Sequence, residues 1–180
     1  MLPARIALVM LGAIAVLAVL AQDSNTRFGF PISYIVSFYD GILESALGWI
    51  PESLQHSKVA PDWQPWWKQY VVLQAMPLAL FTFALARGEG HRAGLSIAFG
   101  MAGFAVGFAG GLISLAVGGG VADTRPASFV VGGVVVSALA AVSALLLPQP
   151  LKSLFWYAGS RLLAIFGLGI AAAVVGGWQP

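Results

Sequence analysis

The chain has 180 residues, of which 59% are hydrophobic and only 9% charged, and its net charge is +2. Soluble domains carry about 25% charged residues, so this composition, with a mean hydropathy of +0.87, predicts an integral membrane protein without a separate soluble domain. The nine Lys and Arg form no basic run and cysteine is absent, which argues against nucleic-acid binding, disulfides and Cys-ligated metals.

Residues 5–21 form the first apolar run, and two interpretations of it stay open. As a transmembrane helix the run is slightly short, since about 17–25 residues usually span a bilayer. As a cleaved secretory signal, residues 1–21 have a basic start at Arg5, an apolar centre and small residues before Gln22. We predict a retained helix with a cytoplasmic N-terminus; in either case the loop 22–65 is extracytoplasmic.

Residues 31–50 have the periodicity of an amphipathic helix, bounded by Pro31 and Pro51. The polar side carries few cations, so attraction to anionic lipid does not hold the helix at the membrane. We predict that it lies in the membrane interface or packs on the outer ends of the spans. Its apolar side comprises Ile35, Phe38, Tyr39, Ile42, Ala46, Trp49 and Ile50, and its polar side Ser33, Ser37, Asp40 and Glu44.

Aromatic residues mark the point where the chain enters the membrane again. We expect Trp63, Trp66, Trp67 and Tyr70 to form a belt at the level of the lipid head groups, and Trp178 to anchor the far end of the chain.

Four further apolar stretches are long enough to span a bilayer and are joined by short connections. With residues 5–21 they give a single polytopic domain over residues 1–180. Gln74 is the one strongly polar side chain of the second span, and we expect it to face another helix because lipid offers it no partner. The four stretches cover about residues 66–86, 93–117, 128–147 and 154–178.

Small residues at helical spacing predict close helix packing, most clearly within residues 93–117. There they alternate at spacings of four and three, which lets two helix backbones approach closely. Gly103, Gly107 and Gly111 also form a doubled GxxxG motif, so this helix has two candidate packing faces, one for the protein interior and one for a partner. The alternating set is Ser96, Gly100, Gly103, Gly107, Gly110 and Ser114; later spans repeat it at Gly133, Ser137, Ala140 and Ala144, and at Ser160, Ala164, Gly167 and Ala171.

Ionisable side chains are nearly absent from the predicted spans, and Arg161 is the exception. A charge inside a span is a functional candidate by default. Arg161 either extends back to the cytoplasmic surface or contacts an anionic lipid head group or a partner's carboxylate. His56 and His91 lack the paired spacing of a metal site, and we predict no metal, cofactor or enzyme, since no base accompanies the serines of the spans.

Together these patterns predict an all-α integral membrane protein. It is a bundle of five transmembrane helices, or four if residues 1–21 are cleaved, plus one extracytoplasmic amphipathic helix. The basic residues near the span ends favour an N-terminus on the cytoplasmic side of a bacterial cytoplasmic membrane.

For function, we expect an accessory or assembly subunit of a larger membrane complex. Its partners would be lipids and either other transmembrane subunits or further copies of the chain. The alternative is a homo-oligomeric pore or permease lined by the Gly-rich helix 93–117. A third hypothesis, an enzyme acting on lipid at the outer surface, depends on Asp40, Glu44, Glu52 or Asp123.

Overall fold

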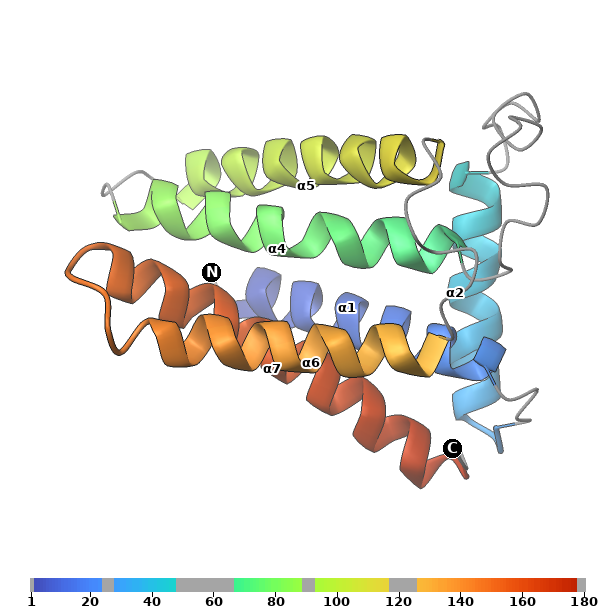
Figure 1. Cartoon of the computed structure of the whole chain (residues 1–180). Coiled ribbons are helices and arrows are strands. Elements are labelled where there is room, and N and C mark those ends of the chain that lie inside the picture. The colour runs from blue at the N-terminus through green and yellow to red at the C-terminus, as the bar shows by residue number, and fades with distance from the viewer. Residues whose placement is uncertain (1, 24–27, 48–66, 89–92, 117–125, 178–180) are drawn as a thin grey trace.

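The computed structural model describes residues 2–23, 28–47, 67–88, 93–116 and 126–177, and the regular secondary structure in these ranges is helical (Figure 1). The expectation of an all-helical protein is confirmed for this part of the chain. The helices are α1 (Leu2–Asp23), α2 (Ile32–Leu47), α4 (Trp67–Gly88), α5 (Ala93–Ala116), α6 (Pro126–Ser143) and α7 (Leu151–Val175).

Four of the described helices, α4, α5, α6 and α7, are long and apolar enough to cross a membrane. This confirms the membrane-length character that the composition predicts. α1 has 22 residues, but its apolar stretch within the described residues, Ile6–Gln22, is shorter than that of the other four.

The turn between α6 and α7 lies earlier in the chain than the apolar pattern predicts. α6 ends at Ser143, and the next backbone N–H groups donate to carbonyls three residues back, as in the tightened last turn of many helices. α7 begins directly after Pro150. Arg161 therefore lies ten residues after Leu151, roughly 15 Å along the helix axis at about 1.5 Å per residue.

The long helices lie alongside one another, and α2 lies across one end of them (Figure 1). α1, α4, α5 and α6 run side by side, while α7 crosses them obliquely. We call the end covered by α2 the α2 end. The opposite end, where α1, α5 and α7 begin, is the N-terminal end.

α1 is the centre of the packing, because it contacts α2, α4, α6 and α7. Its residues 15–20 are at most 3% exposed. Glycines bring α7 close to it: a β-carbon placed on Gly12 would lie 2.8 Å from Ile165, and one on Gly169 would lie 2.6 Å from Val16. The second half of α1 is thus part of the core of the bundle.

α5 packs along α4 through small residues that we call the glycine row. A β-carbon placed on Gly107 would lie 2.8 Å from the Cα of Ala75, and one on Gly103 would lie 2.7 Å from the carbonyl oxygen of Leu78. Real β-carbons do not approach other atoms this closely, so the two backbones meet only because these positions are glycine. The glycine row comprises Ser96, Gly100, Gly103, Gly107 and Gly111.

α5 is an outer helix of the bundle, and α4 is an inner one. Only 17% of the residues in the most apolar stretch of α5 are buried, against 56% for α4. Among the described elements, α5 packs extensively on α4 alone. Most of the surface of α5 is therefore left for lipid or for a partner.

α2 presents apolar side chains on two sides. The buried side consists of Val36, Tyr39, Leu43 and Leu47. This side lies next to the predicted apolar side around the helix, and it is the one that contacts the end of the bundle. Much of the predicted apolar side, including Ile35, Phe38 and Ile42, is exposed together with Tyr34.

We predict that Gly107→Leu lowers the apparent melting temperature of the protein in detergent micelles. The new side chain meets the Ala75 backbone and must force α4 and α5 apart, and overpacking of this kind typically costs about 1–3 kcal/mol. Gly110→Leu is the matched control, because a β-carbon there would meet no atom within 4 Å. Equal losses in both variants would contradict packing through the glycine row.

Candidate functional site

A second row of small residues lies on the side of α5 that faces away from α4. At about 3.6 residues per turn, Ala105 is about half a turn from Gly103 and points to the opposite side. The larger exposed side chains of Met101 and Val106 flank this row, and a row of small residues lets another membrane helix approach closely. The alanine row, as we name it, comprises the exposed residues Ala98, Ala102, Ala105 and Ala109.

α7 also carries an exposed row of small residues, Ala164, Gly167 and Ala171. A β-carbon placed on Gly167 would meet no atom within 4 Å. Most of the small-residue seam that the sequence indicates for this helix therefore lies outside the bundle. The inward contact to α6 uses Gly159 instead, where a β-carbon would lie 2.7 Å from the backbone nitrogen of Ala141.

Sequence reasoning missed the inward-facing glycines Gly12, Gly159 and Gly169, because they do not repeat at GxxxG or heptad spacing. One signal could have identified Gly169. It continues the three-and-four spacing of Leu162 and Ile165, which are buried on the same side of α7.

One predicted packing residue of α5 stands outside the glycine row. Gly110 is exposed, and a β-carbon there would meet nothing, while Ser114, seven residues after Gly107 and so on the same side of the helix, is half-buried as Gly107 is. Gly111 occupies the place next to α4 that the alternating spacing gives to Gly110, since a β-carbon on it would lie 3.3 Å from Val71. The inner side of α5 thus follows the alternating spacing as far as Gly107 and then continues to Gly111, the last residue of the doubled GxxxG motif.

Of the predicted packing residues of α6, Gly133 faces α7 and Ser137 forms a hydrogen bond within α6. A β-carbon placed on Gly133 would overlap the ring of Phe166. Ser137 is buried and its hydroxyl donates to the Gly133 carbonyl oxygen at 2.6 Å.

The predicted aromatic belt is only partly within the described residues. Trp67 and Tyr70 are buried in the protein, 7% exposed each, because the first turn of α4 is covered by neighbouring elements. The rings of Tyr70 and Phe129 are 5.3 Å apart. Trp63, Trp66 and Trp178 lie outside the described residues.

Gln69, and not Gln74, is the buried amide of α4. The Gln74 side chain is exposed, although its β-carbon lies 3.5 Å from a β-carbon placed on Gly111, so Gln74 borders another helix, as expected, without being buried against it. It stands at the edge of the contact with α5. Gln69 is 3% exposed, and its Nε2 donates to Oδ1 of Asp40 at 2.7 Å, which ties α4 to α2.

The carboxylates of α2 contact the first turn of α4. Glu44 forms an ion pair with Lys68. Partial burial raises the pKa of the Asp40 carboxyl, while the hydrogen bond from Gln69 and the charge of Lys68 oppose that rise. Burial, together with the nearby Asp40 charge, raises the pKa of the Tyr39 hydroxyl. This side of α2 is therefore a docking contact as well as a solvated face.

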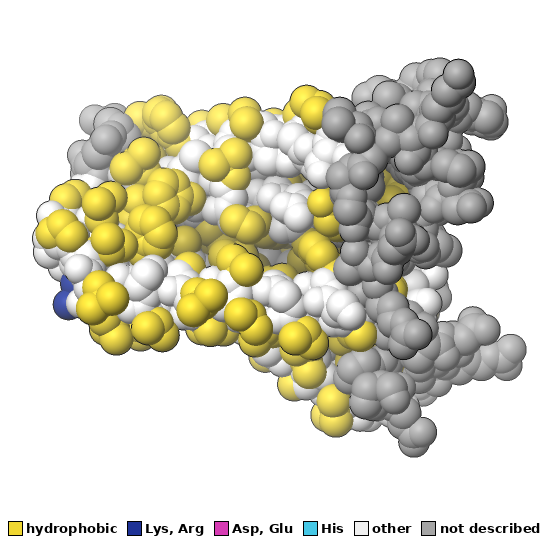
Figure 2. All heavy atoms as spheres, in the orientation of Figure 1, with side chains coloured by type: hydrophobic (Ala, Val, Ile, Leu, Met, Phe, Trp, Pro, Cys, Tyr) yellow, Lys and Arg dark blue, Asp and Glu magenta, His cyan; other side chains and the backbone are white. Residues whose placement is uncertain are grey.

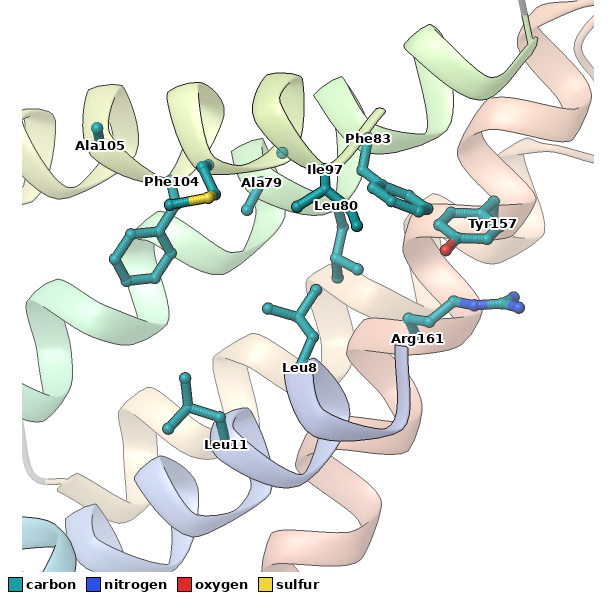
Figure 3. Close-up of a pocket in the computed structure, with 12 residues that line it drawn as sticks. Leu8, Leu11, Ala79, Leu80, Phe83, Ile97, Phe104, Ala105, Tyr157 and Arg161 are labelled. Carbon is teal, nitrogen blue, oxygen red and sulfur yellow. The ribbon is translucent and has the colours of Figure 1, made fainter. Parts of the chain in front are cut away.

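A pocket of about 470 Å³ lies between α1, α4, α5 and α7 (Figure 3). Its lining is almost entirely apolar, and Arg161 stands at one end. The guanidinium carbon is 4.0 Å from the centre of the Tyr157 ring, and Nη1 donates to the Ser160 hydroxyl oxygen at 3.0 Å. The aliphatic part of Arg161 lines the pocket, while the guanidinium extends away from the pocket centre (Figure 3).

A cluster of metal-ligating side chains is absent from the described part of the chain. No three His, Cys, Asp or Glu side chains lie together there. His56, His91, Glu52 and Asp123 fall outside the described residues. Comparison with protein-family models, curated proteins and solved structures gives no match.

We predict that the docking of α2 weakens as pH rises through the raised pKa of Asp40. A carboxyl with a higher pKa in the folded state holds its proton more tightly there, so its contribution is greatest below the ordinary Asp pKa of about 3.9 and is lost above the raised value. Hydrogen exchange of the α2 amides, corrected for intrinsic rates, should show severalfold less protection at the upper end of this range.

Asp40→Asn should abolish this pH dependence, because the amide still accepts the hydrogen bond from Gln69 but cannot ionise. Glu44→Gln is the control and should keep the dependence. Rising protection of α2 with pH in the unsubstituted protein, or an unchanged pH profile in Asp40→Asn, would contradict the assignment.

Proposed function

We propose that the chain is a membrane protein with five spanning helices, α1 and α4 to α7, that acts as an accessory or assembly subunit of a larger membrane complex. Its partners are other transmembrane subunits or further copies of the chain. They bind through helix packing within the lipid.

The exposed alanine row of α5 is the observation that carries this proposal. The glycine row on the other side of the helix is already occupied by α4, so the alanine row is available to a partner. Small residues favour association of membrane helices because they allow close van der Waals contact between backbones. The exposed row on α7 supplies a second surface of the same kind.

The burial of α1 supports five spans over a cleaved signal. Removal of residues 1–21 would take away the helix against which α4, α6 and α7 pack. At about 1.5 Å per residue, its 22 residues extend roughly 33 Å, enough for a hydrocarbon core of about 30 Å.

The distribution of charge supports a cytoplasmic N-terminal end. Arg87 lies at the end of α4 and Lys152 at the start of α7, both at the N-terminal end, and the Lys or Arg atoms visible in Figure 2 lie there too. At the other end the described residues include one such cation, Lys68, which is paired with Glu44 of α2. Because the cytoplasmic ends of membrane helices carry the excess of Lys and Arg, we infer that the N-terminal end faces the cytoplasm. The α2 end then lies on the outer side of a bacterial cytoplasmic membrane.

The position of α2 fits this orientation. Its exposed apolar side chains suit a helix at the lipid–water boundary, and its buried side holds it against the bundle. Hydrophobic side chains cover much of the visible face between the two ends of the molecule (Figure 2).

The alternative, a pore lined by the Gly-rich helix, has less support. Most of the glycines that motivated it, namely Gly100, Gly103, Gly107 and Gly111, face α4. A lumen formed by several copies would therefore have to be lined by the remaining, apolar sides of α5.

We predict that Gly167→Phe and Ala102→Phe reduce severalfold the share of the chain recovered in a larger complex, because each fills an exposed row without entering the bundle. The measurement is native mass spectrometry after solubilisation in mild detergent. Leu168→Phe and Gly110→Phe are the controls: Leu168 is exposed and already bulky, and Gly110 is exposed, lies outside the alanine row, and has no atom within 4 Å of a β-carbon placed on it.

Recovery of the unsubstituted protein as a stable lone monomer would remove the proposal. Equal losses in the row variants and their controls would show that the rows are not the contact. Ion or solute flux through liposomes that contain the chain alone would favour the pore.

A further inference from the structure

We propose that the pocket between α1, α4, α5 and α7 binds an acyl chain of an anionic phospholipid, with the head group held by Arg161. The proposal does not rest on the accessory function, although Ala105 of the alanine row and the neighbouring Met101 also line the pocket. It is assigned from the shape of the pocket, its lining and the charge at one end.

The pocket has the size and chemistry of a hydrocarbon site. Its volume of about 470 Å³ falls in the range of about 300–1,000 Å³ that is usual for small-molecule sites. α1 contributes Leu8 and Leu11, α4 contributes Leu80 and Phe83, and α5 contributes Phe104 among others. Such a lining offers an acyl chain dispersion contacts and offers a polar solute almost no hydrogen-bonding partner.

The pocket is accessible from the side of the bundle, where lipid lies. Its two outer walls are α1 and α5, which do not pack extensively on each other in the described structure. Leu11 on one wall is 41% exposed and Met101 on the other is 69% exposed. α4 forms the floor between these walls (Figure 3). A lipid chain can therefore enter laterally, without crossing the protein.

Arg161 gives the pocket a cationic end. Within the described ranges it forms no ion pair; the ion pair found there, between Lys68 and Glu44, is at the α2 end. One of its five N–H donors goes to Ser160, and the Tyr157 ring supports its face. The described part of the chain thus places a guanidinium beside an apolar pocket without placing a carboxylate on it.

The direction of the Arg161 side chain fits a phospholipid better than a free fatty acid buried within the bundle. Helix side chains lean toward the N-terminus of their own helix, and the guanidinium extends back over Tyr157, toward the N-terminal end of the bundle. An anionic phosphate at head-group depth is the matching group, since guanidinium binds phosphate with two parallel hydrogen bonds. The acyl chain then runs from that head group into the pocket.

The test is a native mass spectrometry titration of the full-length protein in detergent with phosphatidylglycerol and, separately, phosphatidylcholine of the same acyl chains. Arg161→Gln should bind phosphatidylglycerol with at least threefold lower affinity and should bind phosphatidylcholine as the unsubstituted protein does. Lys152→Gln removes a charge from the exposed start of the same helix, outside the pocket, and should bind as the unsubstituted protein does.

The pocket itself is tested by Leu11→Trp, which fills it from the α1 wall and should lower the binding of both lipids at least threefold. Met10→Trp is the matched control, because Met10 is 50% exposed and does not line the pocket. Size-exclusion profiles and melting temperatures of the four variants verify folding.

Equal phosphatidylglycerol binding by Arg161→Gln and Lys152→Gln would overturn the head-group assignment, and equal binding by the two tryptophan variants would overturn the pocket. If Leu11→Trp does not fold, the pocket is tested instead by labelling the unsubstituted protein with phosphatidylglycerol that carries a photoreactive acyl chain. Labelling of residues 8–11 and 97–105 supports the site, and labelling confined to other segments overturns it. If Arg161→Gln or Leu11→Trp loses lipid but is still recovered in a complex of unchanged mass, the lipid site is separate from the proposed accessory function.

Discussion

The approach of α5 to α4 at backbone distance is the contact on which both the alanine row and the pocket depend. In lipid, apolar side chains gain little from leaving the solvent, so two apolar helices associate through close van der Waals contact and matched shape. The glycine row provides both, because a β-carbon at Gly107 would meet the Ala75 backbone. Once this contact fixes the rotation of α5, the alanine row must face outward and the pocket must open between α5 and α1.

The bundle accordingly separates into an inner group and an outer group of helices. α1, α4 and α7 contact one another and supply most of the buried residues, whereas the most apolar stretches of α5 and α6 are each only 17% buried. An outer helix rich in small residues has a surface that can serve a partner. The same division creates the lateral opening of the pocket, since an outer helix is held from one side only.

The helices and their approximate bounds could be predicted from the sequence because apolar length and periodicity are local properties. The inner side of α5 could not, because Gly110 and Gly111 fit two overlapping spacings and the choice between them depends on the shape of α4. The burial of Trp67 likewise depends on where neighbouring helices pack. The contact of Gln69 with Asp40 joins residues that are 29 positions apart. The sequence singled out only Arg161 among the pocket residues as a contact for lipid or a partner, because the rest of the lining forms only when α1, α4, α5 and α7 pack together.

Disulfide trapping in native membranes tests the glycine-row contact most directly, because the chain has no cysteine of its own. A β-carbon on Gly111 lies 3.5 Å from that of Gln74, within the range of about 3.5–4.5 Å found in disulfides. After oxidation, and cleavage at a protease site inserted into residues 89–92, the variant Gln74→Cys with Gly111→Cys should remain one covalent species. The variant Gln74→Cys with Gly110→Cys should separate into two fragments. Equal trapping of both pairs, or preferential trapping of the Gly110 pair, would contradict the account.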